Sequence, residues 1–134
     1  MRTAVDSNVL LDVLKPDPAH RESSLAALEQ AAVDGALVVG DVVWAEVGGR
    51  FESHEACARA FGAAGIEFVP TEATAAHVAG RAWLDYRRRG GKRERMLADF
   101  LVGAHALRHA DRLLTRDRGY YRTYFPRLRI WQPG

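Results

Sequence analysis

The sequence predicts an α/β fold, a three-layer α/β/α sandwich with a mostly parallel central sheet, in a single domain over residues 1–134. Short β-favouring runs alternate with helical patterns along the whole chain, which is typical of a parallel sheet with helices on both faces. A length of 134 residues suits one hydrophobic core. Hydrophobic residues make up 48% of the chain, so we expect a folded protein and not a disordered one.

Capping and turn residues set the bounds of the elements predicted in the N-terminal half. Asp17 and Pro18 suit the N-cap and first position of a helix that Gly35 ends, and Ser53 suits the cap of the next long helix. In order, we expect a strand at Arg2–Asp6, a helix capped by Ser7 or Asn8 and running to about Leu14, a helix at Ala19–Asp34 with Leu25, Leu28 and Ala32 on one face, a strand at Ala36–Val39, a helix capped by Asp41 that carries Glu46, a helix at His54–Ala64, and a strand at Ile66–Val69.

The C-terminal half continues the alternation. Gly90 and Gly91 separate two helical patterns, and a basic link follows them. The predicted elements are a helix from Glu72 to about Arg89 with Val78, Ala82, Trp83 and Tyr86 inside, a helix from about Met96 to His109, a strand at Arg112–Thr115, a short aromatic-rich turn or helix, and a strand at Leu128–Trp131.

Composition also bounds the setting of the protein. Cys57 is the only cysteine, so an internal disulfide is excluded and a reducing cytoplasm is the expected location. Apolar runs are far shorter than a membrane span, and we expect neither a membrane partner nor a signal peptide.

Charge is distributed unevenly along the chain. Residues 1–80 carry 5 basic and 12 acidic side chains, whereas residues 81–134 carry 14 basic and 5 acidic side chains. A GC-rich coding bias explains an abundance of arginine but not its concentration in one half. This asymmetry is an expected footprint of a polyanionic partner.

Four acidic residues are candidates for a common site: Asp6, Glu46, Asp99 and Asp117. In an open parallel α/β sheet, chemistry takes place just beyond the carboxyl ends of the strands. Asp6 ends the first predicted strand and Asp117 follows the fourth. Asp99 is the most informative of the four, because its helix is apolar nearly all round and an unpaired charge there is costly.

Each of these acids also has a structural interpretation. Asp6 and Asp117 suit helix caps or turns, Glu46 suits an exposed helix position, and Asp99 suits a first helical turn or a partner for Arg95. For two further acids we prefer the structural interpretation: Asp41 as an N-cap and Asp12 as a solvated helix residue.

Convergence of the four carboxylates would require a cation. At an effective dielectric constant near 20, two carboxylates about 4 Å apart repel by roughly 4 kcal/mol. An all-oxygen site suits Mg²⁺ or Mn²⁺, and the histidines lack zinc-ligand spacing. The hypothesis fails if the four acids lie far apart or are neutralised by arginines.

The segments that hold these acids resemble PIN-domain ribonucleases, and more narrowly VapC-type toxins of toxin–antitoxin pairs. The similar residues are 5–11, Glu46, 98–106 and 113–121, so the resemblance covers essentially the whole chain. Ser7 stands where many relatives have Thr, and both are hydroxyls. The resemblance implies that Asp6, Glu46, Asp99 and Asp117 are metal ligands, and it implies a homodimer and a cognate antitoxin that blocks the active site.

The expected function is therefore a metal-dependent endoribonuclease, the toxin of a type II toxin–antitoxin system. Carboxylate-bound Mg²⁺ or Mn²⁺ would activate a water that attacks the RNA phosphodiester, leaving a 5′-phosphate and a 3′-hydroxyl. We expect Asp6 and Asp99 as direct ligands, Glu46 and Asp117 to complete the site, and Ser7, Asn8 and Thr115 as supports or, equally, as cap and turn residues.

Basic and aromatic side chains supply candidate RNA contacts. Tyr120 and Tyr121 suit base stacking but more often such residues pack in a core. The basic residues that we expect near RNA phosphates, or alternatively at solvated helix ends, are Arg87, Arg88, Arg89, Lys92, Arg93, Arg95, Arg116 and Arg118.

Three rival functions are weighed against the nuclease. A phosphorelay receiver needs a lysine after a late strand, but the only lysines are Lys15 and Lys92. A haloacid-dehalogenase-like phosphatase needs a second Asp where this chain has Asn8. A non-catalytic nucleic-acid-binding PIN-like module is the main alternative, and uptake of Mn²⁺ separates it from the enzyme.

Overall fold

A computed structural model describes residues 1–15, 17–92 and 95–134, and within them five strands form one parallel sheet. The strand order is β3-β2-β1-β4-β5, and Ala4 in the central strand pairs with Val38 on one side and Leu113 on the other. The strands are β1 (Thr3–Val5), β2 (Leu37–Val39), β3 (Ile66–Phe68), β4 (Arg112–Leu114) and β5 (Ile130–Trp131).

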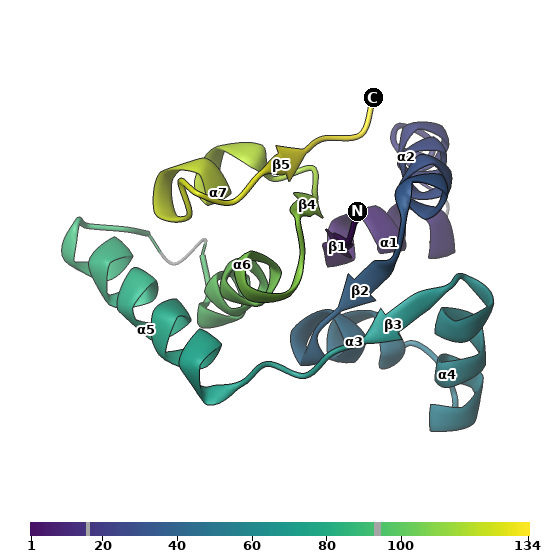
Figure 1. Cartoon of the computed structure of the whole chain (residues 1–134), viewed down its shortest axis with the longest axis horizontal. Helices are drawn as coiled ribbons and strands as arrows, with labels where there is room; N and C mark the ends of the chain where they lie inside the picture. The colour runs from purple at the N-terminus through teal and green to yellow at the C-terminus, as the bar shows by residue number, and fades with distance from the viewer. Residues whose placement is uncertain (16, 93–94) are drawn as a thin grey trace.

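Helices cover both faces of this sheet. Figure 1 shows α1, α2 and α4 on one side and α5, α6 and α7 on the other. Right-handed crossovers explain the division, because the chain steps from β1 to β3 in one direction and from β4 to β5 in the other. The helices are α1 (Ser7–Leu14), α2 (Arg21–Asp34), α3 (Asp41–Gly48), α4 (His54–Ala63), α5 (Ala73–Arg88), α6 (Leu97–His109) and α7 (Arg118–Tyr124). The predicted three-layer α/β/α sandwich is confirmed.

The core lies on both faces of the central strands. Val5, Val38 and Leu113 are almost completely buried, as expected for strands covered on both sides. Phe100 of α6 is fully buried and contacts the aromatic residues of α7, including Tyr120 at 5.0 Å between ring centroids. None of the helices in the described part of the chain is both long and apolar enough to cross a bilayer.

In α2, Leu25, Leu28 and Ala32 lie on one face as predicted, and all three line a groove. Leu28 packs against the core, but the buried residues of this helix are Ser24, Ala27 and Ala31. Ser24 donates a hydrogen bond of 2.6 Å to Asp12 Oδ2 in α1, and small residues at this contact allow the two helices to pack closely.

The predicted inner face of α5 contains one error. Val78 is 44% exposed, because Ala75 and Ala79 make the close contact instead. Ala82, Trp83 and Tyr86 pack against the core as expected.

The cap predictions gave mixed results. Ser53 caps α4 through a hydrogen bond from the Ala56 amide, as predicted. The cap of α1 is Asp6 rather than Ser7 or Asn8. Asp17 accepts a hydrogen bond from the Ala19 amide in a turn, so α2 begins later than predicted, at Arg21.

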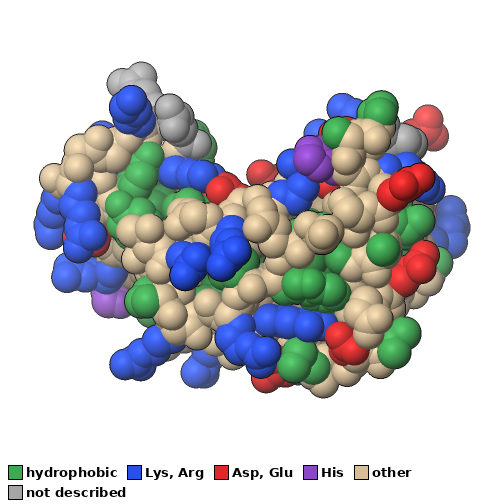
Figure 2. Space-filling view, turned by 90° about the horizontal axis from the view of Figure 1, so that it is seen from above, with side chains coloured by type: hydrophobic (Ala, Val, Ile, Leu, Met, Phe, Trp, Pro, Cys, Tyr) green, Lys and Arg blue, Asp and Glu red, His purple; other side chains and the backbone are tan. Residues whose placement is uncertain are grey.

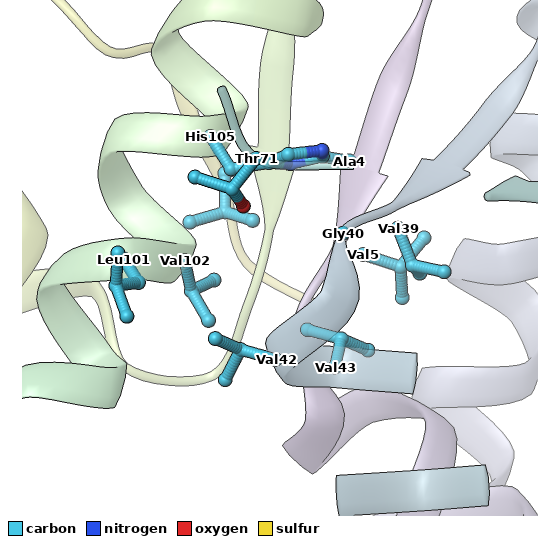
Figure 3. A pocket seen from close by; sticks show the side chains of 11 residues that line it. Ala4, Val5, Val39, Gly40, Val42, Val43, Thr71, Leu101, Val102 and His105 are labelled. Carbon is cyan, nitrogen blue, oxygen red and sulfur yellow. The ribbon is translucent and has the colours of Figure 1, made fainter. Parts of the chain in front are cut away.

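A buried histidine fixes α6 to the sheet. His105 Nε2 donates to the Val69 carbonyl oxygen at 2.7 Å, just beyond β3. Gly40 permits this approach, because a Cβ atom there would lie 2.8 Å from His105 Cδ2. His105 also lines a small cavity of about 10 Å³, together with Val42 and Val102. Figure 3 shows the side chains around this cavity.

Candidate active site

The direction of chain progression reverses between β1 and β4. From β1 the chain adds strands on one side, and after β3 it returns to add β4 and β5 on the other side. In open α/β sheets, ligands bind outside the carboxyl ends of the strands at such a switch point. Asp6 lies immediately beyond β1 and Thr115 immediately beyond β4.

Asp6 is a buried carboxylate that serves as the N-cap of α1. Its Oδ1 accepts a hydrogen bond from the Ser7 amide at 2.8 Å. Its Oδ2 accepts from the Thr115 hydroxyl at 2.8 Å and from the Tyr121 hydroxyl at 3.0 Å. The side chain is thus held by donors from three separate elements, and the capping alternative for Asp6 is confirmed.

Burial dominates the electrostatics of Asp6. Loss of water raises the pKa of this carboxyl above its ordinary value, and the three hydrogen bonds oppose that effect only in part. The negative charge of Asp99 raises the pKa further. A nearby cation would reverse both effects by stabilising the ionised form.

The Thr115 hydroxyl connects Asp6 to the next two residues of the site. It donates to Asp6 and accepts hydrogen bonds from Asn8 Nδ2 at 3.3 Å and from the Asp117 amide at 3.0 Å. Asn8 Oδ1 in turn accepts from the Arg116 amide at 3.2 Å. The hydroxyl therefore uses its one proton and both lone pairs, and it fixes the turn after β4 relative to the start of α1.

Ser7 holds Glu46 toward the same place. Glu46 is an exposed residue of α3, and its Oε1 accepts a hydrogen bond of 2.7 Å from the Ser7 hydroxyl. Because Ser7 follows Asp6 directly, this contact ties the second carboxylate to the residue next to the first.

Asp99 lies in the first turn of α6, as one of its structural interpretations predicted, and Met96 is the N-cap. Asp99 Oδ2 accepts a hydrogen bond from the Met96 amide at 2.9 Å. Its charge also raises the pKa values of Asp6, Tyr120 and Tyr121, which places this carboxylate within electrostatic reach of all three groups.

Asp117 is paired with an arginine. Both of its oxygens accept hydrogen bonds from Arg95, one from Nη2 at 2.8 Å and the other from Nη1. The two side chains are 29% and 32% exposed. The expectation of Asp99 as the partner of Arg95 is thus wrong, and Asp117 already has a counter-charge.

The four acids therefore do not form a ready metal cage, and Asp117 meets the condition, neutralisation by an arginine, that counts against the hypothesis. Within residues 1–15, 17–92 and 95–134, no three His, Cys, Asp or Glu side chains are arranged to hold a metal ion. Each acid is instead engaged by a hydrogen-bond donor of the chain, as described above.

The donors nevertheless suit a hard divalent cation, because all are carboxylate oxygens. One observation supports this fit. The buried Tyr120 hydroxyl has no hydrogen-bond partner among the described residues, and burial followed by the charge of Asp99 raises its pKa. An unsatisfied polar atom in a negative field is expected beside an ion or its water.

The basic candidates fall into different environments. Arg87 lies over the Trp83 ring at 5.4 Å, Arg89 pairs with Asp85 at 3.3 Å, and Arg93 lies outside the described residues. Arg88, Lys92 and Arg118 are exposed. Figure 2 shows Lys and Arg side chains gathered over the end of the molecule that carries α5, beside a hollow with acidic side chains near its edge.

Arg116 departs from the expectation that it meets a phosphate. Its Nε and Nη2 donate to Asp12 at 2.8 and 3.0 Å. Asp12 is only 3% exposed, so its prediction as a solvated helix residue is wrong. The pair joins α1 to the turn after β4.

Sequence reasoning missed Asp12 and the role of Tyr121. Asn8 and Asp12 lie four residues apart in α1, and Arg116 precedes Asp117. These patterns are compatible with many arrangements, so the sequence held no distinct signal for the pairing of Asp12 with Arg116. Tyr120 and Tyr121 are buried, which confirms their core interpretation, but the Tyr121 hydroxyl also reaches Asp6.

Comparison with known proteins identifies the family. The PIN domain family model matches residues 3–126. The match covers most of the chain, and the protein therefore belongs to the PIN domain family.

Solved structures show the same fold. VapBC2 from Rickettsia felis bound to a promoter DNA fragment has a chain that is 17% identical, with a TM-score of 0.73 and 100% of both chains covered. A toxin-antitoxin complex from Klebsiella pneumoniae gives 20% identity and a TM-score of 0.70, with 98% of each chain covered. VapBC-1 from nontypeable Haemophilus influenzae gives 19% identity and a TM-score of 0.70, with 98% of each chain covered. No curated protein matches the chain.

Proposed function

We propose that this PIN domain is a metal-dependent endoribonuclease that acts as the toxin of a toxin–antitoxin pair. The observation that carries the proposal is Asp6, a buried carboxylate at the switch point of the sheet. Its hydrogen-bond partners among the described residues are all neutral. Glu46 is tied to the neighbouring residue, and the charge of Asp99 acts on Asp6. The basic end of the molecule supplies attraction for an RNA backbone.

The chain's own residues have separate tasks in this proposal. Asp6 and Asp99 would hold Mg²⁺ or Mn²⁺ directly, and Glu46 and Asp117 would complete the site. The bound cation would neutralise charge on the phosphate and increase the acidity of a water. Thr115 and Tyr121 fix the Asp6 carboxylate, and Ser7 orients Glu46. Restricting these rotamers in advance lowers the cost of ordering the ligands.

Cleavage of RNA by the purified protein tests the activity. We expect cleavage with Mg²⁺ or Mn²⁺ that stops with a chelator, and products with 5′-phosphate ends. Asp6→Asn and Asp99→Asn should each lower the rate at least 100-fold, while Asp85→Asn, an exposed acid of α5, should retain it. Full activity in Asp6→Asn would contradict the assignment. Metal-independent RNA binding without cleavage would favour the non-catalytic alternative.

An apolar groove is the surface that we assign to the antitoxin. It measures about 270 Å³ and lies between α1, α2, α3 and α4. Its lining includes Leu25, Leu28 and Ala32, which the sequence predicted to share one face of α2. The R. felis, K. pneumoniae and H. influenzae structures are all of toxin–antitoxin proteins, which supports a partner chain as the occupant.

Two neighbouring positions of α2 test this surface. Ala32 and Val33 are both exposed, but only Ala32 lines the groove. Each variant is expressed in bacteria together with the candidate antitoxin gene, the adjacent small open reading frame. Cells that express Ala32→Glu should stop growing because the antitoxin no longer binds, and cells that express Val33→Glu should continue to grow. Equal neutralisation of both variants would exclude the groove as the docking surface. The expected homodimer stays a prediction, which sedimentation of the purified chain tests.

A further inference from the structure

Arg95 forms a two-point ion pair with Asp117, one of the proposed metal ligands, whereas an arginine free in solvent would not. Its guanidinium donates to both oxygens of Asp117, a two-point geometry that is stronger than a single charged hydrogen bond. The guanidinium also lies 4.5 Å from the centre of the Tyr120 ring. The Arg95 guanidinium is thus held by the two oxygens of one carboxylate and by the face of one aromatic ring.

The position of Arg95 relates it to the other acids as well. The Asp117 hydrogen bonds and the charges of Asp117 and Asp99 raise the pKa of Arg95. The charge of Arg95 in turn acts on Tyr120, the residue whose hydroxyl is unsatisfied among the described residues. Arg95 therefore supplies positive charge at the place where the proposed function requires a metal ion.

We propose that Arg95 is a built-in counter-ion that competes with the divalent cation for Asp117. The inference rests on the proposed function, because it assumes that Asp117 is a ligand. Binding of the cation to Asp117 then requires the Arg95 guanidinium to leave, so part of the binding free energy is spent on breaking this pair. Removing the pair should therefore strengthen metal binding by the factor that corresponds to this free energy.

Calorimetric titration of the RNA-free protein with MnCl₂ tests the competition and does not depend on catalytic activity. Arg95→Ala should bind Mn²⁺ about three- to ten-fold more tightly than the unmodified protein, as expected for a partly exposed bidentate pair. Arg95→Lys, which keeps the charge but loses the two-point geometry, should fall between them.

Arg118→Ala is the matched control for charge alone. Arg118 is exposed and adjacent to Asp117, and its removal changes the net charge by the same amount. Its Mn²⁺ affinity should stay within two-fold of the unmodified protein. In an Asp117→Asn background, Arg95→Ala should give no further gain, because the competed ligand is absent.

The outcomes separate this inference from the proposed function. Mn²⁺ binding by the unmodified protein with no gain in Arg95→Ala, or an equal gain in Arg118→Ala, overturns the competition and leaves the metal site standing. Absence of Mn²⁺ binding in both the unmodified protein and Arg95→Ala overturns the competition and the metal-dependent function together.

Discussion

Among the residues that the structure describes, Asp6 accepts hydrogen bonds from neutral donors, whereas Asp117 meets a guanidinium. This contrast divides the candidate ligands into two kinds. Neutral dipoles contact the buried charge of Asp6, so a cation would gain much by approaching it. The half-exposed charge of Asp117 is already compensated. We therefore expect Asp6 to dominate metal affinity and Asp117 to modulate it.

Replacing Ser7 by Ala should weaken metal binding by about 10-fold without loss of fold, since partners that orient ligands typically contribute 10- to 100-fold. The change releases Glu46, which the Ser7 hydroxyl holds at 2.7 Å. Calorimetric titration with Mn²⁺ measures the effect. Ser53→Ala is the control: it removes the cap of α4 and should cost about 1 kcal/mol of stability but no metal affinity. Equal affinities in the two variants would contradict the role of Ser7.

Arg116→Met should lower the free energy of unfolding by about 2–3 kcal/mol, because it leaves the Asp12 carboxylate buried without its ionic partner. Chemical denaturation measures the loss. The double variant Asp12→Leu/Arg116→Met should recover part of it, since no uncompensated charge then remains. Arg127→Met, at an exposed position, should change stability little. A full loss in the double variant would show that packing, and not charge, governs this contact.

Local sequence signals predicted the elements better than their rotations. The order and approximate bounds of strands and helices follow from Gly, Pro and capping residues, which act over a few positions. The buried face of α2 does not, because it depends on the Ser24–Asp12 hydrogen bond between two helices. Likewise, the sequence placed Asp6 at the end of a strand but could not reveal that Tyr121 reaches it from α7.

Helix α6 packs closely on the chain after α7, and a glycine allows it. A Cβ atom on Gly103 would lie 2.4 Å from the Phe125 ring. Gly103→Ala should therefore destabilise the protein by roughly 1–3 kcal/mol. Gly80→Ala should instead stabilise it by about 0.5–1 kcal/mol, because Gly80 lies within α5 with open space around it. Thermal unfolding compares the two variants, and equal shifts would contradict the packing described for α6.

His105 of α6 should make the stability of the folded protein depend on pH. Burial lowers the pKa of His105 below its ordinary value, with a smaller contribution from His109. The unfolded chain therefore takes up a proton near pH 6.5 that the folded chain resists, so stability should fall as the pH decreases from about 7 to 5. In His105→Gln this contribution is absent, and the loss of stability over the same range should be smaller. Parallel pH profiles for the two proteins would exclude His105 as the cause.

At the level of the whole molecule, topology brings residues distant in sequence to one place. The reversal between β1 and β4 sets Asp6 beside Thr115, 109 residues apart in the chain. Glu46 of α3 accepts a hydrogen bond from the adjacent Ser7, and the charge of Asp99 in α6 acts on Asp6. The sequence could predict that Asp6 and the end of β4 lie together, because carboxyl ends of parallel strands share one edge. It could not predict that Arg95 would meet Asp117, since that contact is made between side chains from two separate segments.

Diffraction from crystals soaked in MnCl₂ tests the metal centre most directly, because anomalous scattering locates the ion itself. We predict a peak bonded to carboxylate oxygens of Asp6 and Asp99, with the Arg95 side chain displaced from Asp117. A map without a peak at these residues, with Arg95 still paired to Asp117, would contradict the proposed site.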